Sequence, residues 1–362
     1  MTGKLGVAVI GCGKAGQAQL HWFARHPNSR IVALFDPLAE KGQQAAGAYN
    51  AASLSSWQAA VNYAGVDLVS LCGPESVRAE QAIFALDNGK HALCEKPFAN
   101  TLADCDRMIE AAERNQRALL AYYNMRFHPV VHAVDEHIAS IGRIYAARFS
   151  YTQFRTSLSW RHRIEQGGGV LKSQGVHAID LALRWLGPVN TVSGEMAIIH
   201  GGREVEDFAL VHLRMESGAI GEVYTAYTDR QPEEMRAQLQ GNLGKLEFRL
   251  NPYLPERNGV WLKKQGAKRR IALRQASEMD PVYPGLMDCS QGAIKHVVDH
   301  LLAGRPSPLD GRAGRRSIEV VLAAYESQRR RTKIALPLRS FSLNSLADCF
   351  PRFAAGDETL TE

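Results

Sequence analysis

Two short stretches of the chain, far apart in the sequence, carry residue types that could perform chemistry together. The first is the glycine-rich run Gly11-Cys12-Gly13-Lys14-Ala15-Gly16, and the second is the tripeptide Glu95-Lys96-Pro97. Glycines at this spacing let backbone N–H groups approach a pyrophosphate, and a lysine can give or take a proton. The two stretches therefore indicate a redox site in which a bound dinucleotide and a lysine act on one substrate.

The glycine run lies in the sequence context that a dinucleotide site requires. The apolar run Leu5–Ile10 predicts a buried parallel strand, residues 17–25 predict an amphipathic helix, and Arg30–Phe35 predicts a second strand. A glycine pattern alone can be purely structural. Strand, glycine loop, helix and strand in this order instead predict a dinucleotide-binding unit, with backbone N–H groups of the helix start facing the phosphates.

Each glycine and one carboxylate have an expected task in that unit. Gly11 permits the tight turn, Gly13 lets the backbone approach the pyrophosphate, and Gly16 lets the helix pack closely on the strand. Asp36 follows Gly16 by 20 residues, at the distance where a carboxylate binds the ribose hydroxyls. A carboxylate there repels a 2′-phosphate, so we expect NAD rather than NADP, although one nearby arginine could offset Asp36.

Lys96 is expected at the ligand-binding edge of the same sheet. Further strands are predicted at 66–72, 91–94 and 118–122, and helices at 77–88 and 101–117. Gly73-Pro74 and Glu95-Lys96-Pro97 follow two of these strands, at the carboxyl edge where ligands bind in such sheets. Lys96 could be an ordinary loop charge. Beside the positive nicotinamide its pKa would fall, which makes it a usable general acid or base for an alcohol–ketone interchange.

Composition limits the class of protein. With 362 residues, 45% hydrophobic and 22% charged, the chain has room for two domains, and no apolar run could span a membrane. The chain enters a strand pattern at once, so we expect no signal peptide and a cytoplasmic location. The 6 cysteines show no Cys-x-x-Cys pair or metal spacing, which predicts reduced thiols and no metal. The basic clusters behind the net charge of +6 are expected to be solvated surfaces rather than a nucleic-acid site, and they would suit an anionic small substrate.

Several further motifs give the chain a family resemblance. They are Met125-Arg-Phe-His-Pro129, Gly167-Gly-Gly169, Gly175-Val-His-Ala-Ile-Asp180 and Val205-Glu-Asp207. With the glycine loop and Glu95-Lys96-Pro97, they make the chain from Leu5 to about Leu338 resemble the glucose–fructose oxidoreductase / inositol dehydrogenase / rhizopine catabolism (Gfo/Idh/MocA) family of NAD(P)-dependent oxidoreductases. The combination is far more specific than any single motif.

The resemblance implies an α/β fold with two domains. An N-terminal Rossmann domain with a doubly wound parallel sheet (1–123) would precede an α/β domain with an open, mostly antiparallel mixed sheet (124–338), which binds substrate and serves oligomerisation. Residues 339–362 would form a C-terminal extension. The sequence of the second domain agrees, with strands predicted at 144–152, 189–196, 208–215, 220–228, 237–240, 245–249 and 260–263. Helices are predicted at 171–185, 290–302 and 311–331. In this family the sheet usually covers a subunit interface, so a homodimer or homotetramer is expected.

The resemblance also implies the catalytic residues. Family members usually place a lysine, an aspartate and a histidine around the reacting carbon, and these map onto Lys96, Ser173 and His177. A lone histidine on an apolar helix is often a core residue, but the preceding glycines and the family position favour catalysis. Ser173 replaces the aspartate, so it can only donate and accept hydrogen bonds. The proton relay would rest on Lys96, with His177 assisting.

The binding residues follow from the motifs and the resemblance. The residues expected to contact the cofactor are Gly11, Cys12, Gly13, Lys14, Ala15, Gly16, Asp36, Cys72, Gly73, Pro74, Glu95, Lys96 and Arg126. Those expected to contact the substrate are Lys96, Arg126, Arg161, Lys172, Ser173 and His177. Arg126 could instead form a salt bridge that fixes the two domains. Arg155, Arg161, Arg163 and Lys172 would suit a phosphate or carboxylate if two or more point inward, and could otherwise be surface charge.

The sequence thus predicts an NAD-dependent oxidoreductase that moves a hydride between nicotinamide and a hydroxyl-bearing ring carbon of a sugar or sugar derivative. The substrate could be a nucleotide sugar, sugar phosphate or uronate, or a neutral sugar or cyclitol. Two alternatives use the same scaffold: a non-catalytic NAD-binding regulatory protein, and a redox-neutral glycosidase that uses NAD transiently. The oxidised carbon, the physiological direction and the role of the tail are left open.

Overall fold

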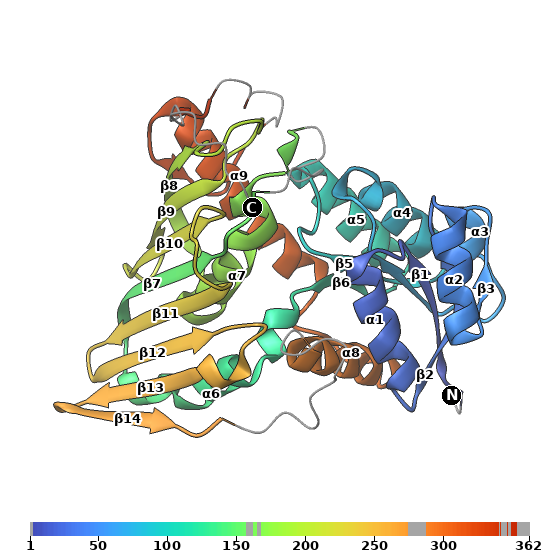
Figure 1. The fold of residues 1–362 in the computed structure, drawn as a ribbon, viewed down its shortest axis with the longest axis horizontal. Helices are drawn as coiled ribbons and strands as arrows, with labels where there is room; N and C mark the ends of the chain where they lie inside the picture. The colour runs from blue at the N-terminus through green and yellow to red at the C-terminus, as the bar shows by residue number, and fades with distance from the viewer. Residues whose placement is uncertain are drawn as a thin grey trace. The chain divides into compact units, whose positions relative to one another are not determined.

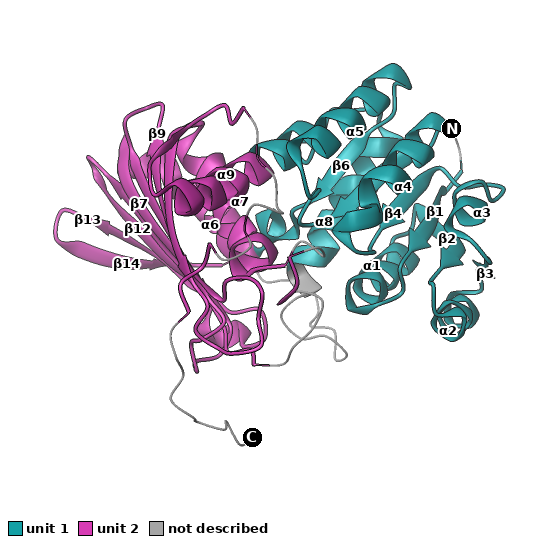
Figure 2. Ribbon diagram, turned by 90° about the horizontal axis from the view of Figure 1, so that it is seen from above, with its two compact units in different colours: residues 1–128, 287–316 teal, residues 129–286, 317–362 magenta. Residues whose placement is uncertain are grey.

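The computed structural model describes residues 3–156, 162–164, 168–273, 287–339, 341, 346 and 349–352. The chain forms two compact units, shown in teal and magenta in Figure 2. Unit 1 contains Met1–His128 and Met287–Arg316, and unit 2 contains Pro129–Leu286 and Ser317–Glu362.

Unit 1 is built on a six-stranded sheet in which every neighbouring pair is parallel. The strands, in spatial order, are β3 (Ala52–Ser53), β2 (Ser29–Phe35), β1 (Leu5–Ile10), β4 (Leu68–Leu71), β5 (His91–Glu95) and β6 (Leu119–Tyr122). The residues of β1 and β4 are all buried, as the apolar runs predict. The order reverses beside β1, which is the first strand of the chain (Figure 1) and has β2 on one side and β4 on the other (Figure 2). Ligands of doubly wound sheets bind at such a switch point.

The helices of unit 1 connect these strands and include a late segment of the chain. They are α1 (Lys14–Arg25), α2 (Ala39–Tyr49), α3 (Trp57–Val61), α4 (Glu75–Asp87), α5 (Leu102–Arg114), the 3₁₀-helix η1 (Asn124–Phe127), α8 (Met287–Leu302) and the start of α9 (Gly311–Arg330). Helix α5 begins where Thr101 accepts a hydrogen bond from the Asp104 amide at 3.0 Å.

The compact units differ from the predicted domains in the position of α8. The sequence assigned residues 287–316 to the second domain, but in the structure they pack in unit 1. Helix α8 contacts α1 and η1, and Gly292 lies so close to Phe127 that an added Cβ would be 2.9 Å from the Phe127 Cβ. Residues late in the chain thus complete the first unit. The division into a cofactor domain and a substrate domain stays a prediction.

Unit 2 is built on a nine-stranded sheet. Its strands, in spatial order, are β14 (Ala267–Ile271), β13 (Gly259–Lys264), β12 (Gly244–Leu250), β11 (Glu234–Gly241), β7 (Ile144–Thr152), β10 (Ile220–Ala226), β9 (Phe208–Met215), β8 (Val189–Ala197) and β15 (Ile334–Ala335). All neighbouring pairs are antiparallel except β7 and β10, which are parallel. The predicted α/β class, with a parallel sheet followed by a mostly antiparallel mixed sheet, is therefore confirmed.

One face of the second sheet is packed and the other carries charges. In β7, Phe149 and Tyr151 are buried whereas Arg148 is exposed. Helix α7 (Val176–Leu186) contacts β7 and β10, and α6 (Pro129–His137) contacts β12 and β13. Short 3₁₀-helices follow α6 as η2 (Ile138–Ile141) and precede β13 as η5 (Pro255–Arg257). This packing accounts for the alternating polarity of the predicted strands.

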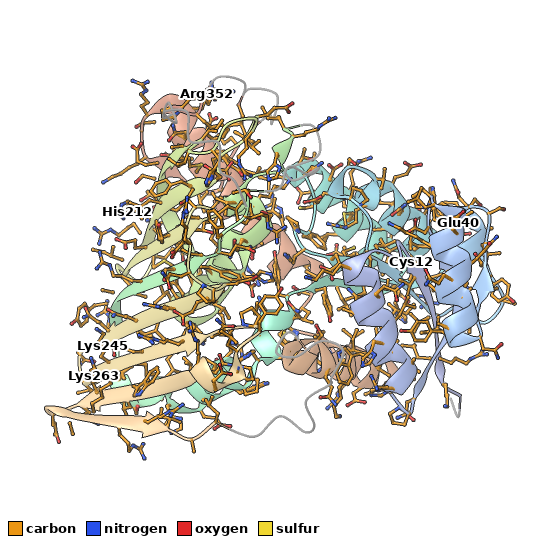
Figure 3. The ribbon with its side chains drawn as sticks, in the orientation of Figure 1. Cys12, Glu40, His212, Lys245, Lys263 and Arg352 are labelled. Carbon is orange, nitrogen blue, oxygen red and sulfur yellow. The ribbon has the colours of Figure 1, made fainter. Side chains whose placement is uncertain are left out.

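Several basic residues on the surface of each unit form ion pairs. Lys245 and Lys263, on the neighbouring strands β12 and β13, each lie 2.9 Å from Glu247 (Figure 3). In unit 1, Arg315 pairs with Asp106. The described part of the chain contains no helix long and apolar enough to cross a membrane.

The predicted helix at 171–185 has an unexpected start. Residues Leu171–Gly175 form a single-turn π-helix (η4), and the α-helix α7 begins only at Val176. Gly175 is packed tightly here, since an added Cβ would lie 2.9 Å from Leu171 and 3.0 Å from Thr225 of β10. A π-turn inserts an extra residue into a helix and is frequent at functional sites.

Candidate active site

The glycine loop between β1 and α1 has the geometry of a ligand cradle. Gly11 has φ +95°, and a Cβ there would lie 3.0 Å from the backbone of Cys72 and Gly73. At Gly16 a Cβ would lie only 1.9 Å from the carbonyl oxygen of Gly11, so α1 requires glycine at this contact. At Gly13 a Cβ would meet no described atom within 4 Å. Gly13 therefore lines open space, which fits the predicted approach of a pyrophosphate to its backbone.

The start of α1 can receive an anion. Helix α1 begins at Lys14 with Gly13 as its N-cap residue, and glycine has no side chain that could cap the helix. Its first N–H groups carry the positive end of the helix dipole. Lys14 and Ala15, which were predicted to contact the cofactor from the loop, lie in this first turn, because α1 begins three residues before the predicted helix. Cys12 precedes it (Figure 3) as a buried thiol, whose pKa is raised to about 11 by burial and by Asp36. Cys12 is therefore a neutral packing group.

Asp36 follows β2 at the edge of the sheet where the glycine loop lies. Its carboxylate accepts hydrogen bonds from the backbone amides of Cys12 at 2.8 Å and Leu38 at 2.9 Å. The side chain remains partly exposed. These two bonds fix the carboxylate beside the glycine loop, at the place predicted for recognition of the ribose hydroxyls.

Arg78 holds two loops at this edge together, and the sequence analysis missed it. This buried side chain in α4 donates to the carbonyl oxygen of Gly73 at 2.6 Å and to the carbonyl oxygen of Pro97. It thereby joins the predicted cofactor loop Cys72-Gly73-Pro74 to the loop that carries Lys96. In the sequence Arg78 looks like an ordinary surface charge on a helix, so only its burial identifies this task.

A buried hydrogen-bond chain supports Lys96. The Ser70 hydroxyl donates to Gln19 at 2.5 Å, and the Gln19 amide donates to Glu95 at 2.7 Å. Glu95 in turn accepts the backbone N–H of Lys96 at 3.1 Å. Burial raises the pKa of Glu95, and the charges of Lys96 and Arg78 partly offset that rise. Lys96 itself is half-buried after β5, and its peptide bond to Pro97 is cis.

Arg126 is buried within unit 1, in the 3₁₀-helix after β6. Its guanidinium donates to the carbonyl oxygen of Pro308 at 2.7 Å and lies 5.7 Å from the centre of the Tyr123 ring. Unit 1 thus gathers the predicted cofactor residues after the carboxyl ends of β1, β2, β4, β5 and β6. Contact of Arg126 with cofactor or substrate stays a prediction.

Ser173 and His177 lie in unit 2 on the π-turn and on α7. The Ser173 hydroxyl lies 2.5 Å from the carbonyl oxygen of Gly169 and 2.5 Å from the hydroxyl of Tyr227. His177 is buried, with its ring centre 6.1 Å from that of Tyr151. Tyr227 was not expected from the sequence, because it reaches Ser173 from 54 residues further along the chain. The structure therefore places a serine and a tyrosine hydroxyl together in unit 2.

The other predicted substrate residues have different surroundings. Lys172 is fully buried on the π-turn. Arg155 is half-buried, with its guanidinium 5.4 Å from the centre of the Tyr227 ring, and Arg163 is exposed. Arg161 lies outside the described residues. Asp180, to which no chemistry was assigned, lies 3.5 Å from the Ser317 hydroxyl.

Glu206 stabilises the π-turn through a hydrogen bond to its backbone. Its carboxyl accepts the Leu171 amide at 2.9 Å and the Tyr325 hydroxyl at 3.0 Å. Gly169, with φ +109°, runs so close that a Cβ would lie 2.4 Å from this carboxyl. Burial raises the pKa of Glu206 to about 8, so the group is protonated at neutral pH.

We expect the stability of the protein to depend on pH through Glu206. The pKa of Glu206 is about 8 in the folded protein, above its ordinary value of 4.5. Its contribution to the stability of the fold is therefore fully present below about pH 4.5 and is lost as the pH rises through 8. Glu206→Gln keeps the acceptor without the titration. Its Tm should therefore rise relative to wild type as the pH goes from 5 to 9. The exposed neighbour Glu204→Gln is the control, and parallel Tm curves for wild type and Glu206→Gln would contradict the assignment.

The protein combines a Rossmann unit, built on a six-stranded parallel sheet, with an α/β unit built on an open, mostly antiparallel mixed sheet. Two family models match the chain. The model described as "Oxidoreductase family, NAD-binding Rossmann fold" matches residues 5–123, and that of the GFO/IDH/MocA C-terminal domain matches residues 132–247. The chain belongs to the Gfo/Idh/MocA family of oxidoreductases, and its first unit contains the NAD-binding Rossmann fold of that family.

Individual relatives extend the comparison. D-apiose dehydrogenase of Paraburkholderia graminis is 28% identical over 235 residues, which cover 64% of this chain and 63% of the relative. The 2,7-anhydro-N-acetylneuraminate hydratase of Escherichia coli is 29% identical over 224 residues, 58% of this chain and 59% of the relative. The match thus spans less than two thirds of the length of either protein. A solved structure of levoglucosan dehydrogenase with NADH and L-sorbose shares the fold, with a TM-score of 0.84 and 20% identity over 92% of this chain and 99% of that one.

Proposed function

We propose that the protein is an NAD-dependent dehydrogenase or reductase that acts on a CH–OH group of a sugar or sugar derivative. One observation carries most of this proposal: Lys96 follows β5 at the same edge of the sheet as the glycine loop after β1. Family membership and the names of sugar dehydrogenases among the relatives support it. A cytoplasmic location and a homodimer or homotetramer belong to the same proposal.

The residues of the chain would bind and orient the cofactor and the substrate, and they would transfer the hydroxyl proton. The open space at Gly13 and the uncapped start of α1 fit a pyrophosphate, and Asp36 would bind the adenosine ribose. The bound dinucleotide supplies the acceptor or donor of the hydride. In the oxidation, Lys96 takes the hydroxyl proton while the carbon–hydrogen bond breaks and the carbonyl forms, with His177 assisting and Ser173 hydrogen-bonding to the substrate.

Coenzyme preference is expected to depend on the charge of Asp36. Asp36→Asn removes the repulsion of a 2′-phosphate. It keeps one carboxamide oxygen, so it retains one of the two hydrogen bonds that the separate carboxylate oxygens accept from the amides of Cys12 and Leu38. We expect the ratio of kcat/KM for NAD over NADP to fall about tenfold, which corresponds to about 1.4 kcal/mol. The Tm of Asp36→Asn should lie between that of wild type and that of Asp36→Ala, which loses both hydrogen bonds. An unchanged coenzyme ratio in Asp36→Asn would contradict this role.

The substrate subclass can be decided by turnover. The buried Lys172 and the half-buried Arg155, both in unit 2, support an anionic sugar such as a sugar phosphate, a uronate or a nucleotide sugar. NADH formation should be measured over a panel of these compounds together with neutral sugars and cyclitols. Turnover of an anionic member supports the anionic subclass, and turnover of neutral members alone discards it. Tight NAD binding without any turnover would favour the non-catalytic regulatory alternative.

A redox-neutral reaction is the second candidate. A hydratase among the relatives favours it, because hydration produces no net change in NAD. The redox-neutral glycosidase belongs to this same candidate. It predicts conversion of an anhydrosugar or cleavage of a nitrophenyl glycoside with a constant amount of NADH. Net NADH formation that is stoichiometric with substrate excludes it.

A further inference from the structure

Unit 1 has a second cavity, away from every residue proposed to bind the cofactor. It has a volume of about 340 Å³ and lies between the end of α5, the start of β6, the end of α8 and the start of α9. Its wall includes Leu119 and Leu120, which form the amino end of β6, and the preceding Ala118. Cofactors of such sheets bind at the carboxyl ends. The cavity is therefore at the opposite edge of the sheet and has no task in the proposed reaction.

The inside of this cavity is apolar. Ile109 and Ala112 of α5, Leu119 of β6 and Leu301 of α8 line it. Gly311 keeps the start of α9 close to this wall, since a Cβ there would lie 2.8 Å from the Leu119 side chain. An apolar wall of this kind suits a ring or a branched carbon body rather than a free inorganic ion.

The charges around the cavity are not balanced. Among the acids, Glu113 is paired with Arg312, and the Asp310 carboxylate accepts the Ala313 amide at 2.8 Å as the cap of α9. Two further guanidiniums lie in the wall. Arg117 donates to the carbonyl oxygens of Gly89 at 2.6 Å and Gln116 at 3.3 Å.

Arg305 is the second of these two guanidiniums. It is exposed in the cavity wall, and within the described ranges it has no carboxylate partner. Arg117 likewise contacts backbone carbonyls but no carboxylate of the described chain. The cavity thus combines an apolar wall with two cations that no acid neutralises, which is complementary to an organic anion.

We propose that this cavity binds a small organic monoanion with an apolar body, such as an aromatic or branched carboxylate or sulfonate. The body is buried against Ile109, Leu119 and Leu301, and the anionic group pairs with Arg305 and Arg117. A volume of about 340 Å³ is near the lower end of the range for ligand pockets, so it admits a body of up to about three rings but not a dinucleotide. The inference is independent of the reaction proposed above.

The probe for this site is 8-anilinonaphthalene-1-sulfonate, whose fluorescence rises in apolar surroundings. It should be titrated into the full chain with saturating NADH present, so that the dinucleotide cradle is filled. Arg305→Glu should weaken binding of the probe at least about tenfold, because a like charge then faces the sulfonate. Arg269→Glu, an equivalent change at an exposed residue of β14, should leave binding within about twofold of wild type.

A cavity-filling variant and two competing ligands of opposite charge provide independent tests of the same site. Ala112→Phe fills the cavity and should abolish the fluorescence, and Arg305→Glu provides the answer if that variant does not fold. Benzoate should displace the probe, whereas benzylamine, which has the same ring and the opposite charge, should not. Equal affinity of wild type and Arg305→Glu, or equal displacement by benzoate and benzylamine, overturns the proposal.

Discussion

Replacing Lys96 by alanine is expected to lower kcat by about 10²–10⁴-fold, the usual contribution of a general acid or base. The side-chain amine of Lys96 is the group that would exchange the hydroxyl proton, whereas Glu95 accepts a hydrogen bond from the backbone N–H of Lys96. Binding of NADH should change little, because the glycine loop and Asp36 are untouched. The measurement is steady-state kcat on the best substrate of the panel, together with NADH affinity by fluorescence.

Lys90 offers a matched control for this variant. It precedes β5, where Lys96 follows the same strand, and its ammonium donates to the Val66 carbonyl at 2.9 Å. Lys90→Ala also removes a lysine side chain, but at the edge of the sheet where the amino ends of the strands lie, so kcat should remain within about twofold of wild type. Retention of more than about a tenth of kcat in Lys96→Ala would contradict the acid–base role.

Gly16→Ala is expected to have the second large effect, on the fold itself. The added Cβ would lie 1.9 Å from the carbonyl oxygen of Gly11, which is backbone and cannot rotate away. Helix α1 must therefore move, at a cost of about 3 kcal/mol or more in the free energy of unfolding. Denaturant unfolding of the apo protein measures this cost. A Gly16→Ala variant as stable as wild type would mean that α1 does not pack on the loop this closely.

Gly13→Ala separates ligand binding from stability in the same loop. Its Cβ meets no described atom within 4 Å, so the unfolding free energy of the apo protein should change by less than about 1 kcal/mol. The same methyl would occupy the space expected for the pyrophosphate, so NADH affinity should fall at least about tenfold. Unchanged affinity would place the pyrophosphate elsewhere.

Much of unit 1 could be predicted because its signals are local. Buried parallel strands such as β1 are continuous apolar runs, and the glycine loop has a spacing that few other structures require. Helix α2 escaped prediction because its alanines, glycine and glutamines form no clear apolar stripe. Strand β14 escaped because its exposed residues are charged. Cross-strand contacts account for it instead, since Lys268 and Arg270 lie 5.4 Å and 5.9 Å from the ring centre of Trp261.

The missed parts of the candidate site depend on distant contacts. Arg78 joins two loops, Tyr227 reaches Ser173, and Glu206 holds the π-turn through Leu171, 35 residues earlier. No spacing rule connects such pairs. The C-terminal extension shows the same effect: it is polar overall, yet Leu346 and Phe350 are buried, and Phe350 packs 6.2 Å from the ring of Tyr325.

Direct transfer of hydrogen from substrate to nicotinamide is the central claim. It is tested by deuterium at the carbinol carbon of whichever panel member is turned over fastest, followed by mass spectrometry of the reduced coenzyme. We expect one deuterium per NADH formed. Lys96→Ala should form NADH only at its residual rate, and that NADH should carry the same label. Deuterium that remains in the product or passes to water, with no net NADH, would contradict the dehydrogenase and favour the redox-neutral alternative.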